Sequence, residues 1–170
     1  MNPSKKLTVR QVILFGILGA LTFALKLGMA ALPNIEPVSM LIMVFATVFG
    51  LKALYPVYIY VAMEVLYFGL GTWNICYLYV WPTLAVVAWL LRNMKGRLGW
   101  AMVSGVFGMA FGALCGIADI FIGRLTFAVN KWASGIPFDL AHCFGNFEMA
   151  LVLFEPLRAL VTKLYARMGK

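Results

Sequence analysis

Four side chains that could do chemistry gather near the C-terminus, in a sequence whose polar residues are otherwise isolated. They are Asp139, the only histidine His142, Asn146 and Glu148. On one helix, Asp139, His142 and Asn146 fall at i, i+3 and i+7, so they share a face. A carboxylate, an imidazole and an amide on one face can hold a polar ligand or move a proton. We interpret this face as one wall of a polar pocket, and Glu148, which lies off it, as a structural hydrogen-bond partner.

The residues before this face favour a helix start. Pro137 suits the first turn of a helix, where its missing N–H costs nothing. Asp139 can cap that start with its carboxylate or complement the positive end of the helix dipole. We therefore expect a helix from about 137 to 161, after a long connection from Gly123 to Gly135.

The composition predicts an integral membrane protein. Of the 170 residues, 64% are hydrophobic and 12% are charged, whereas a soluble domain is about half apolar and a quarter charged. Apolar stretches recur along the whole chain. We read the first of them as a retained span and not as a signal peptide. The net charge of +8 fits cationic cytoplasmic loops better than nucleic-acid binding.

The apolar runs predict an all-α bundle of six transmembrane helices in a single domain, residues 1–170. The spans are expected at about 9–32, 38–50, 53–70, 75–91, 98–122 and 137–161. Pro33 and Pro37 end the first span, and Pro82 kinks the fourth. The second span is short, so we expect it to be tilted or shielded from lipid by its neighbours.

The cations predict that both termini are cytoplasmic, because lysine and arginine accumulate in cytoplasmic segments. Of the 14 lysines and arginines, Arg124 and Lys131 fall on the outer side and Lys26 falls inside a span. The others fall on the inner side: Lys5, Lys6, Arg10, Lys52, Arg92, Lys95, Arg97, Arg158, Lys163, Arg167 and Lys170.

With this orientation, the polar residues gather in the outer half of the bundle, as an outward-facing binding cup requires. A proton relay or a channel usually needs them at more depths. The candidate substrate-binding residues are Glu36, Glu64, Trp73, Asn74, Tyr77, Asp119, Asp139, His142 and Asn146.

Each candidate has a structural alternative. Glu64 can simply pair with Lys26, which has the opposite sign at a similar depth. His142 and Asn146 can serve helix packing alone, and Trp73 and Tyr77 can belong to an interfacial aromatic belt. A charge buried in a bilayer costs about 2.5–3.5 kcal/mol on the insertion scale, so pairing or water contact is expected.

The cysteines and the histidine predict no metal site and no cofactor. Cys76, Cys115 and Cys143 lie in separate segments, and we interpret each as a small buried apolar residue. One histidine and three scattered cysteines provide no ligand spacing for a metal.

Two spans carry stripes of small residues. Gly16, Ala20, Ala24 and Gly28 follow one another at intervals of four, so another helix can approach closely along them. That helix belongs either to this chain or to a partner membrane subunit. The fifth span has a similar face, formed by Gly105, Gly108, Gly112 and Gly116.

Taken together, these features resemble the substrate-binding S components of prokaryotic energy-coupling factor (ECF) transporters. The resemblance covers nearly the whole chain and rests on its size, its six expected spans and its orientation. It also rests on four stretches: Leu-Pro-Asn-Ile-Glu-Pro-Val-Ser from Leu32, Val-Phe-Gly-Leu-Lys-Ala-Leu-Tyr-Pro from Val48, Tyr-Leu-Tyr-Val-Trp-Pro from Tyr77, and Gly-Ile-Pro-Phe-Asp-Leu-Ala-His-Cys-Phe-Gly-Asn-Phe from Gly135.

The resemblance implies a multi-pass protein of a prokaryotic cell membrane that is not an enzyme. It implies a vitamin-like substrate, held in an outward-facing cavity that the connection between the first two spans closes. An Ala-x-x-x-Ala pattern, here Ala20 and Ala24 with Gly16 in the same stripe, would dock on a transmembrane coupling subunit. Two cytoplasmic ATPases would supply the energy, and this chain has no phosphate-binding GxxxxGK[ST] motif of its own.

The substrate stays open at this point. A cobalamin-related compound, a pyridoxine- or pyrimidine-type precursor and a queuosine precursor are all compatible with the resemblance. Asp139 and Glu64 favour a cationic or amine-bearing ligand.

Two other functions are alternatives. One is a stand-alone secondary transporter or channel. The other is an intramembrane enzyme that uses His142 as base, with Asp139 or Glu148 as its partner.

Overall fold

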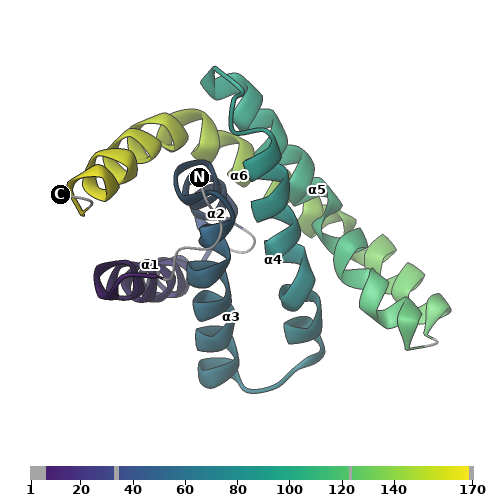
Figure 1. The fold of residues 1–170 in the computed structure, drawn as a ribbon. Coiled ribbons are helices and arrows are strands. Elements are labelled where there is room, and N and C mark those ends of the chain that lie inside the picture. Colours follow the sequence, from purple (N-terminus) through teal and green to yellow (C-terminus); the bar gives the residue numbers. More distant parts are fainter. Residues whose placement is uncertain (1–6, 33–34, 123, 169–170) are drawn as a thin grey trace.

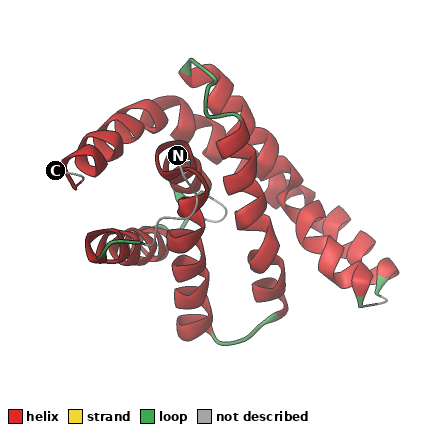
Figure 2. Ribbon diagram, in the orientation of Figure 1, coloured by secondary structure: helices red, strands yellow, loops and turns green. Residues whose placement is uncertain are grey.

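The computed structural model describes residues 7–32, 35–122 and 124–168, and within them it contains helices and no strand (Figures 1 and 2). This confirms the all-α prediction. Pro33, Lys5, Lys6 and Lys170, on which parts of the prediction rest, lie outside the described residues. The elements are α1 (Val9–Gly28), α2 (Val38–Phe49), the short 3-10 helix η1 (Gly50–Ala53), α3 (Leu54–Phe68), α4 (Thr72–Leu90), α5 (Arg97–Phe121) and α6 (Leu125–Met168).

Four stretches of the described chain are long and apolar enough to cross a membrane. They are Val9–Gly28, Val38–Phe68, Trp73–Leu90 and Arg97–Phe121. The 20 residues of α1 extend about 30 Å at the helical rise, which matches the hydrocarbon core of a bilayer. The helical architecture therefore fits a membrane protein.

Successive helices run back and forth along one another. Phe15 stacks on Tyr55 and Lys26 bonds to Glu64, so α1 and α3 run parallel. The chain between them must return, and the contact of Phe15 with Phe49 places the end of α2 beside the first half of α1. Paired contacts show that α4 and α5 are antiparallel and that α5 and α6 are antiparallel. A short connection joins α3 to α4, which pack against each other.

The second helix lies at the centre of the bundle (Figure 1). Every residue from Val38 to Ala46 is buried, mainly against α4 and α6. Neighbouring helices therefore cover α2, the helix that corresponds to the short second predicted span.

The small-residue face of α5 packs against α6. A Cβ atom on Gly108 would lie 2.7 Å from the backbone carbonyl oxygen of His142, and one on Gly112 would collide with the Asp139 carboxylate. The two helices therefore run backbone to backbone, antiparallel, along most of α5 (Figure 1).

The helix expected to begin at Pro137 begins at Leu125 and is 44 residues long. A proline inside a helix costs about 3 kcal/mol or more, but α5 packs along this segment, and Lys131 forms an ion pair with Asp119. The expected connection 123–135 is thus helical from Leu125 onward, and Gly123 lies outside the described residues. Asp139 sits in the interior of α6, so its predicted role as a helix cap is wrong.

The first helix ends earlier than expected, at Gly28, and the chain continues in turns to Leu32. The expectation for two of the cysteines is also corrected, because Cys76 of α4 is disulfide-bonded to Cys115 of α5. Their Cα atoms are 5.0 Å apart, which is within the usual range for a disulfide. Cys143 is free.

Candidate functional site

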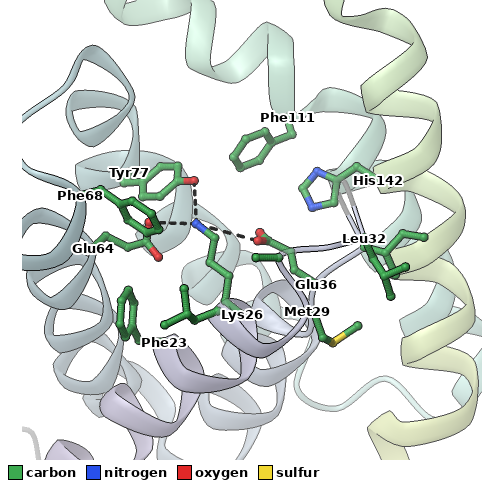
Figure 3. A pocket seen from close by; sticks show the side chains of 13 residues that line it. Phe23, Lys26, Met29, Leu32, Glu36, Glu64, Phe68, Tyr77, Phe111 and His142 are labelled. Atoms are coloured by element: carbon green, nitrogen blue, oxygen red, sulfur yellow. Dashed lines mark hydrogen bonds and ion pairs between the residues drawn. The ribbon is translucent and has the colours of Figure 1, made fainter.

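A cavity of about 260 Å³ opens where α1, its connection to α2, and helices α3 to α6 converge (Figure 3). Its polar lining consists of Lys26, Glu36, Glu64, Tyr77 and His142. Aromatic rings of Phe23, Phe68 and Phe111 line it as well. Because the polar groups come from five different parts of the chain, only the folded bundle brings them together.

Lys26 is the centre of the polar lining. Its Nζ donates hydrogen bonds to Glu64 Oε2 at 2.9 Å and to the Tyr77 hydroxyl at 3.3 Å. Glu36 Oε2 lies 3.9 Å from the same nitrogen, which is within ion-pair range but beyond a hydrogen bond. Figure 3 shows the ammonium group between these three partners.

Two buried polar atoms of the lining have no hydrogen-bond partner within the described chain. They are Glu64 Oε1 and His142 Nε2. Glu64 is 1% exposed and His142 is 3% exposed. A buried polar atom left unpaired costs about 1–3 kcal/mol, so a bound molecule that pairs with both atoms would recover that cost.

Contacts with α5 hold His142 in place. Its backbone rests against Gly108, where a side chain on α5 would collide, and its ring meets Phe111 edge to face at 4.9 Å between centroids. One nitrogen of a neutral imidazole donates and the other accepts. Nε2 can therefore meet either kind of ligand group.

Among the polar residues of the lining, Glu36 lies in the connection between α1 and α2, outside the helices. Burial raises the pKa of its carboxyl group above the ordinary value, although Lys26 acts in the opposite direction. Together with Glu64 and Lys26, it gives the cavity two carboxylates for one ammonium group.

Four of the nine predicted substrate-binding residues line this cavity: Glu36, Glu64, Tyr77 and His142. The predicted pairing of Lys26 with Glu64 is confirmed. Lys26 was not among the nine predicted binding residues, yet it stands at the centre of the site.

Three other predicted residues have partners of their own inside the bundle. Asp139 Oδ1 accepts the backbone N–H of Gly112 at 3.0 Å, and Asn146 donates to the Ser39 hydroxyl at 3.1 Å. Asp139, His142 and Asn146 are all buried on α6, as their shared face predicts, but only His142 reaches the cavity. Asp119 pairs with Lys131 at 2.9 Å.

The two remaining predicted residues belong to the start of α4. Asn74 Oδ1 accepts the backbone N–H of Gly71 at 2.6 Å and thereby caps the helix. Trp73 is 47% exposed, and its ring covers the Cα of Gly71. Neither side chain is part of the cavity lining.

The phenylalanines of the cavity could not be identified from the sequence. Aromatic residues make up 15% of the chain, so a single phenylalanine carries no signal. Phe111 even lies in the glycine-rich helix α5, whose pattern indicated packing.

The small-residue stripe of α1 is a second feature, on a different surface. A Cβ atom on Gly16 or on Gly28 would meet nothing within 4 Å. Ala24 is exposed, and Ala20 is partly exposed. Gly19, on another face of the helix, makes the close approach to Ile59 and Pro56 of α3. At both glycines of the stripe, the space that a side chain would fill is therefore open.

The cavity has the attributes of a binding site: convergent polar groups, aromatic walls and unpaired buried atoms. No group of three or more histidine, cysteine, aspartate or glutamate side chains that could hold a metal ion occurs in residues 7–32, 35–122 and 124–168. No protein-family model, curated protein or solved structure matches this chain.

Proposed function

We propose that this chain is the substrate-capture subunit of an ECF-type importer, a membrane protein of six spans with both termini in the cytoplasm. It binds a small vitamin-like micronutrient in the cavity around Lys26. The observation that carries this proposal is the pair of unpaired buried atoms, Glu64 Oε1 and His142 Nε2, in the lining of one cavity.

The packing directions support six spans. Because α1 and α3 run in the same direction, the chain between them, which includes α2, returns toward the end at which α1 begins. A hydrogen bond from Gln11 to the Tyr165 hydroxyl brings the two ends of the described chain to the same end of the bundle. The cavity lies toward the opposite end, because its lining includes the connection between α1 and α2.

The disulfide supports the orientation. Cys76 immediately precedes Tyr77 of the cavity lining, so its bond to Cys115 lies toward the same end of the bundle as the cavity. Disulfides persist in oxidising compartments and are rare in the cytosol. A cavity at this end therefore faces outward, as capture of a nutrient requires.

The stripe of α1 supports the assignment of partners. Small residues let membrane helices approach closely, and the space beside the glycines of this stripe, where a side chain would stand, is open. A transmembrane coupling subunit is the partner we propose for it, with two cytoplasmic ATPases as the source of energy.

A stand-alone transporter and an intramembrane enzyme are the alternatives. Uptake by the purified chain in vesicles without an ATPase would support the first, and turnover of a bound compound would support the second. The direct test of capture is mass spectrometry of small molecules that co-purify with the protein. We expect one ring-bearing compound, retained by Glu148→Gln and lost from His142→Ala. A folded protein that neither retains nor binds any small molecule would contradict the proposal.

The docking surface has its own test. Ala24→Leu should prevent assembly with the coupling subunit and leave ligand binding unchanged, because Ala24 is exposed and does not line the cavity. Ala113→Leu, at an exposed alanine of α5, is the matched control and should assemble normally. Normal assembly of the Ala24 variant would rule out this surface.

A further inference from the structure

The charges of the cavity are unequal. Glu36 and Glu64 each contribute a carboxylate, and Lys26 contributes the one ammonium group among the lining residues that the structure describes. With both carboxylates ionised, the sum is one negative charge. A ligand with one positive charge would neutralise it.

The free hydrogen-bonding capacity points in the same direction. Lys26 already donates hydrogen bonds to Glu64 and Tyr77. Glu64 Oε1 has no hydrogen bond within the described chain, although the buried Tyr60 hydroxyl interacts with the same carboxylate. Glu36 lies beyond hydrogen-bond distance of Lys26. An ionised carboxylate accepts at both oxygens, so the cavity offers more unfilled acceptors than donors.

The size and the walls limit the ligand further. A cavity of about 260 Å³ is below the range of about 300–1,000 Å³ that drug-sized ligands occupy. Phe111, Phe68 and Tyr77 present rings, which pack well on a planar molecule. One small ring with a short substituent fits this space, and a cobalamin-related macrocycle does not.

Building on the proposed capture function, we propose that the cavity selects a small, ring-bearing monocation. Its charged nitrogen donates hydrogen bonds to Glu64 Oε1 and to the Glu36 carboxylate. Its ring lies against Phe111, and a polar atom at the other end of the molecule pairs with His142 Nε2. Amine-bearing pyridine or pyrimidine compounds belong to this class.

An anionic ligand is the opposite reading, in which Lys26 would bind a carboxylate or phosphate. Such a ligand could bond to the third N–H of Lys26, but it would share an ammonium group that Glu64 already neutralises. It would also bring a third negative charge beside Glu36 and Glu64. The lining therefore favours the binding of a cation over that of an anion.

Three probes with one ring and different charge test the proposal: 3-(aminomethyl)pyridine, 3-(hydroxymethyl)pyridine and nicotinate. Their binding to the purified full-length protein at pH 7 is measured by calorimetry. We expect the cation to bind about tenfold more tightly than the neutral alcohol, which is the effect of one charge-assisted hydrogen bond, and nicotinate to bind most weakly. Glu36→Gln should reduce the preference for the cation several-fold, and Glu148→Gln, at an exposed glutamate of α6, should retain it.

The outcomes separate this inference from the proposed function. If nicotinate binds more tightly than the cation, or if Glu36→Gln has an unchanged preference for the cation, the proposal of a monocationic ligand is wrong. The proposed capture function would still stand. Absence of binding by all three probes, in a folded protein that also retains no co-purifying compound, overturns both.

Discussion

The ion pair between Lys26 and Glu64 is the central interaction of the cavity, and its two members are not equally replaceable. The Glu64 side chain is 2% exposed, whereas that of Lys26 is 20% exposed. Lys26 also has Tyr77 and Glu36 within reach. Removing one partner of a buried pair leaves the other charge without compensation, which costs about 3–5 kcal/mol.

We therefore expect Lys26→Gln to destabilise the protein more than Glu64→Gln does. Lys26→Gln leaves the buried Glu64 carboxylate without its charged partner. Glu64→Gln leaves an ammonium group that still has Glu36 beside it. Thermal unfolding of the purified variants in one detergent provides the comparison. A lower melting temperature for Glu64→Gln would contradict this account of the pair.

Glu36 makes stability depend on pH. Burial raises the pKa of its carboxyl group in the folded protein above the ordinary 4.5. The folded state therefore binds the proton more tightly than the unfolded state does. This contribution to stability is fully present below the ordinary pKa and is lost as the pH rises through the folded-state pKa.

The variant Glu36→Gln cannot lose that contribution. Relative to the wild type, it should gain melting temperature as the pH rises from about 4.5 through the mildly acidic range, since the neutral amide has no charge to bury. Melting curves of both proteins over this range test the difference. A difference that is constant with pH would show that Glu36 has the same proton affinity in both states.

The interaction partner of a residue could be predicted where the sign of its charge and its depth in a span are enough to identify that partner. Lys26 and Glu64 satisfied both conditions, and their pair is present in the structure. Asp139 did not, because its actual partner is a backbone N–H of α5 that only the tertiary packing brings near. The sequence contains no sign of such a contact 27 residues away.

Two helices with similar stripes of small residues have different surroundings. In α5, Gly108 and Gly112 lie directly against α6, whereas in α1 Gly16 and Gly28 face open space. The spacing of small residues predicts close approach in both helices. The spacing does not say whether the approaching helix belongs to the same chain. Only the folded bundle distinguishes packing within the chain, in α5, from an open surface, in α1.

This contrast predicts opposite effects of one substitution. Gly108→Ala would place a methyl group 2.7 Å from a backbone oxygen of α6, and overpacking of this kind typically costs about 1–3 kcal/mol. Gly16→Ala meets no obstacle and should stabilise α1 by about 0.5–1 kcal/mol, because alanine favours a helix over glycine. Melting temperatures of the two variants should fall on opposite sides of the wild type, and a common direction would contradict the packing described for one of the helices.

The helix ends show the limit of local signals. Pro137 predicted a helix start, but α6 begins at Leu125 and continues through this proline. Before it, Ala128 packs on α5 and Lys131 forms an ion pair with Asp119 of α5. By contrast, the start of α5 at Arg97 and the end of α2 at Phe49 agree with the sequence to within one residue. Gly96 and Gly50, at these two ends, have positive φ angles that suit glycine.

At the scale of the whole molecule, polar partners and basic connections separate toward opposite ends. The cavity, the disulfide and the ion pair of Asp119 with Lys131 occupy one end. The connection between α4 and α5, which carries Arg92 and Lys95, occupies the other. This polarity is what the positive-inside rule uses to orient a membrane protein.

The orientation can be tested with single cysteines in a Cys143→Ala background, which leaves the disulfide intact. Leu70 lies between α3 and α4 and is 88% exposed, and Asn93 lies between α4 and α5 and is exposed as well. In the proposed orientation, Leu70→Cys reacts with a membrane-impermeant maleimide on intact cells. In the same orientation, Asn93→Cys reacts only after the membrane is permeabilised, because its connection would then be cytoplasmic.

The two positions report on consecutive connections, so their labelling must be opposite if α4 crosses the membrane. The reverse pattern would place the cavity on the cytoplasmic side, where it could not capture a nutrient from outside, and would remove the basis for an importer. Labelling of both on intact cells would mean that α4 does not cross. The proposed pattern would place the cavity around Lys26 where an external micronutrient can reach it.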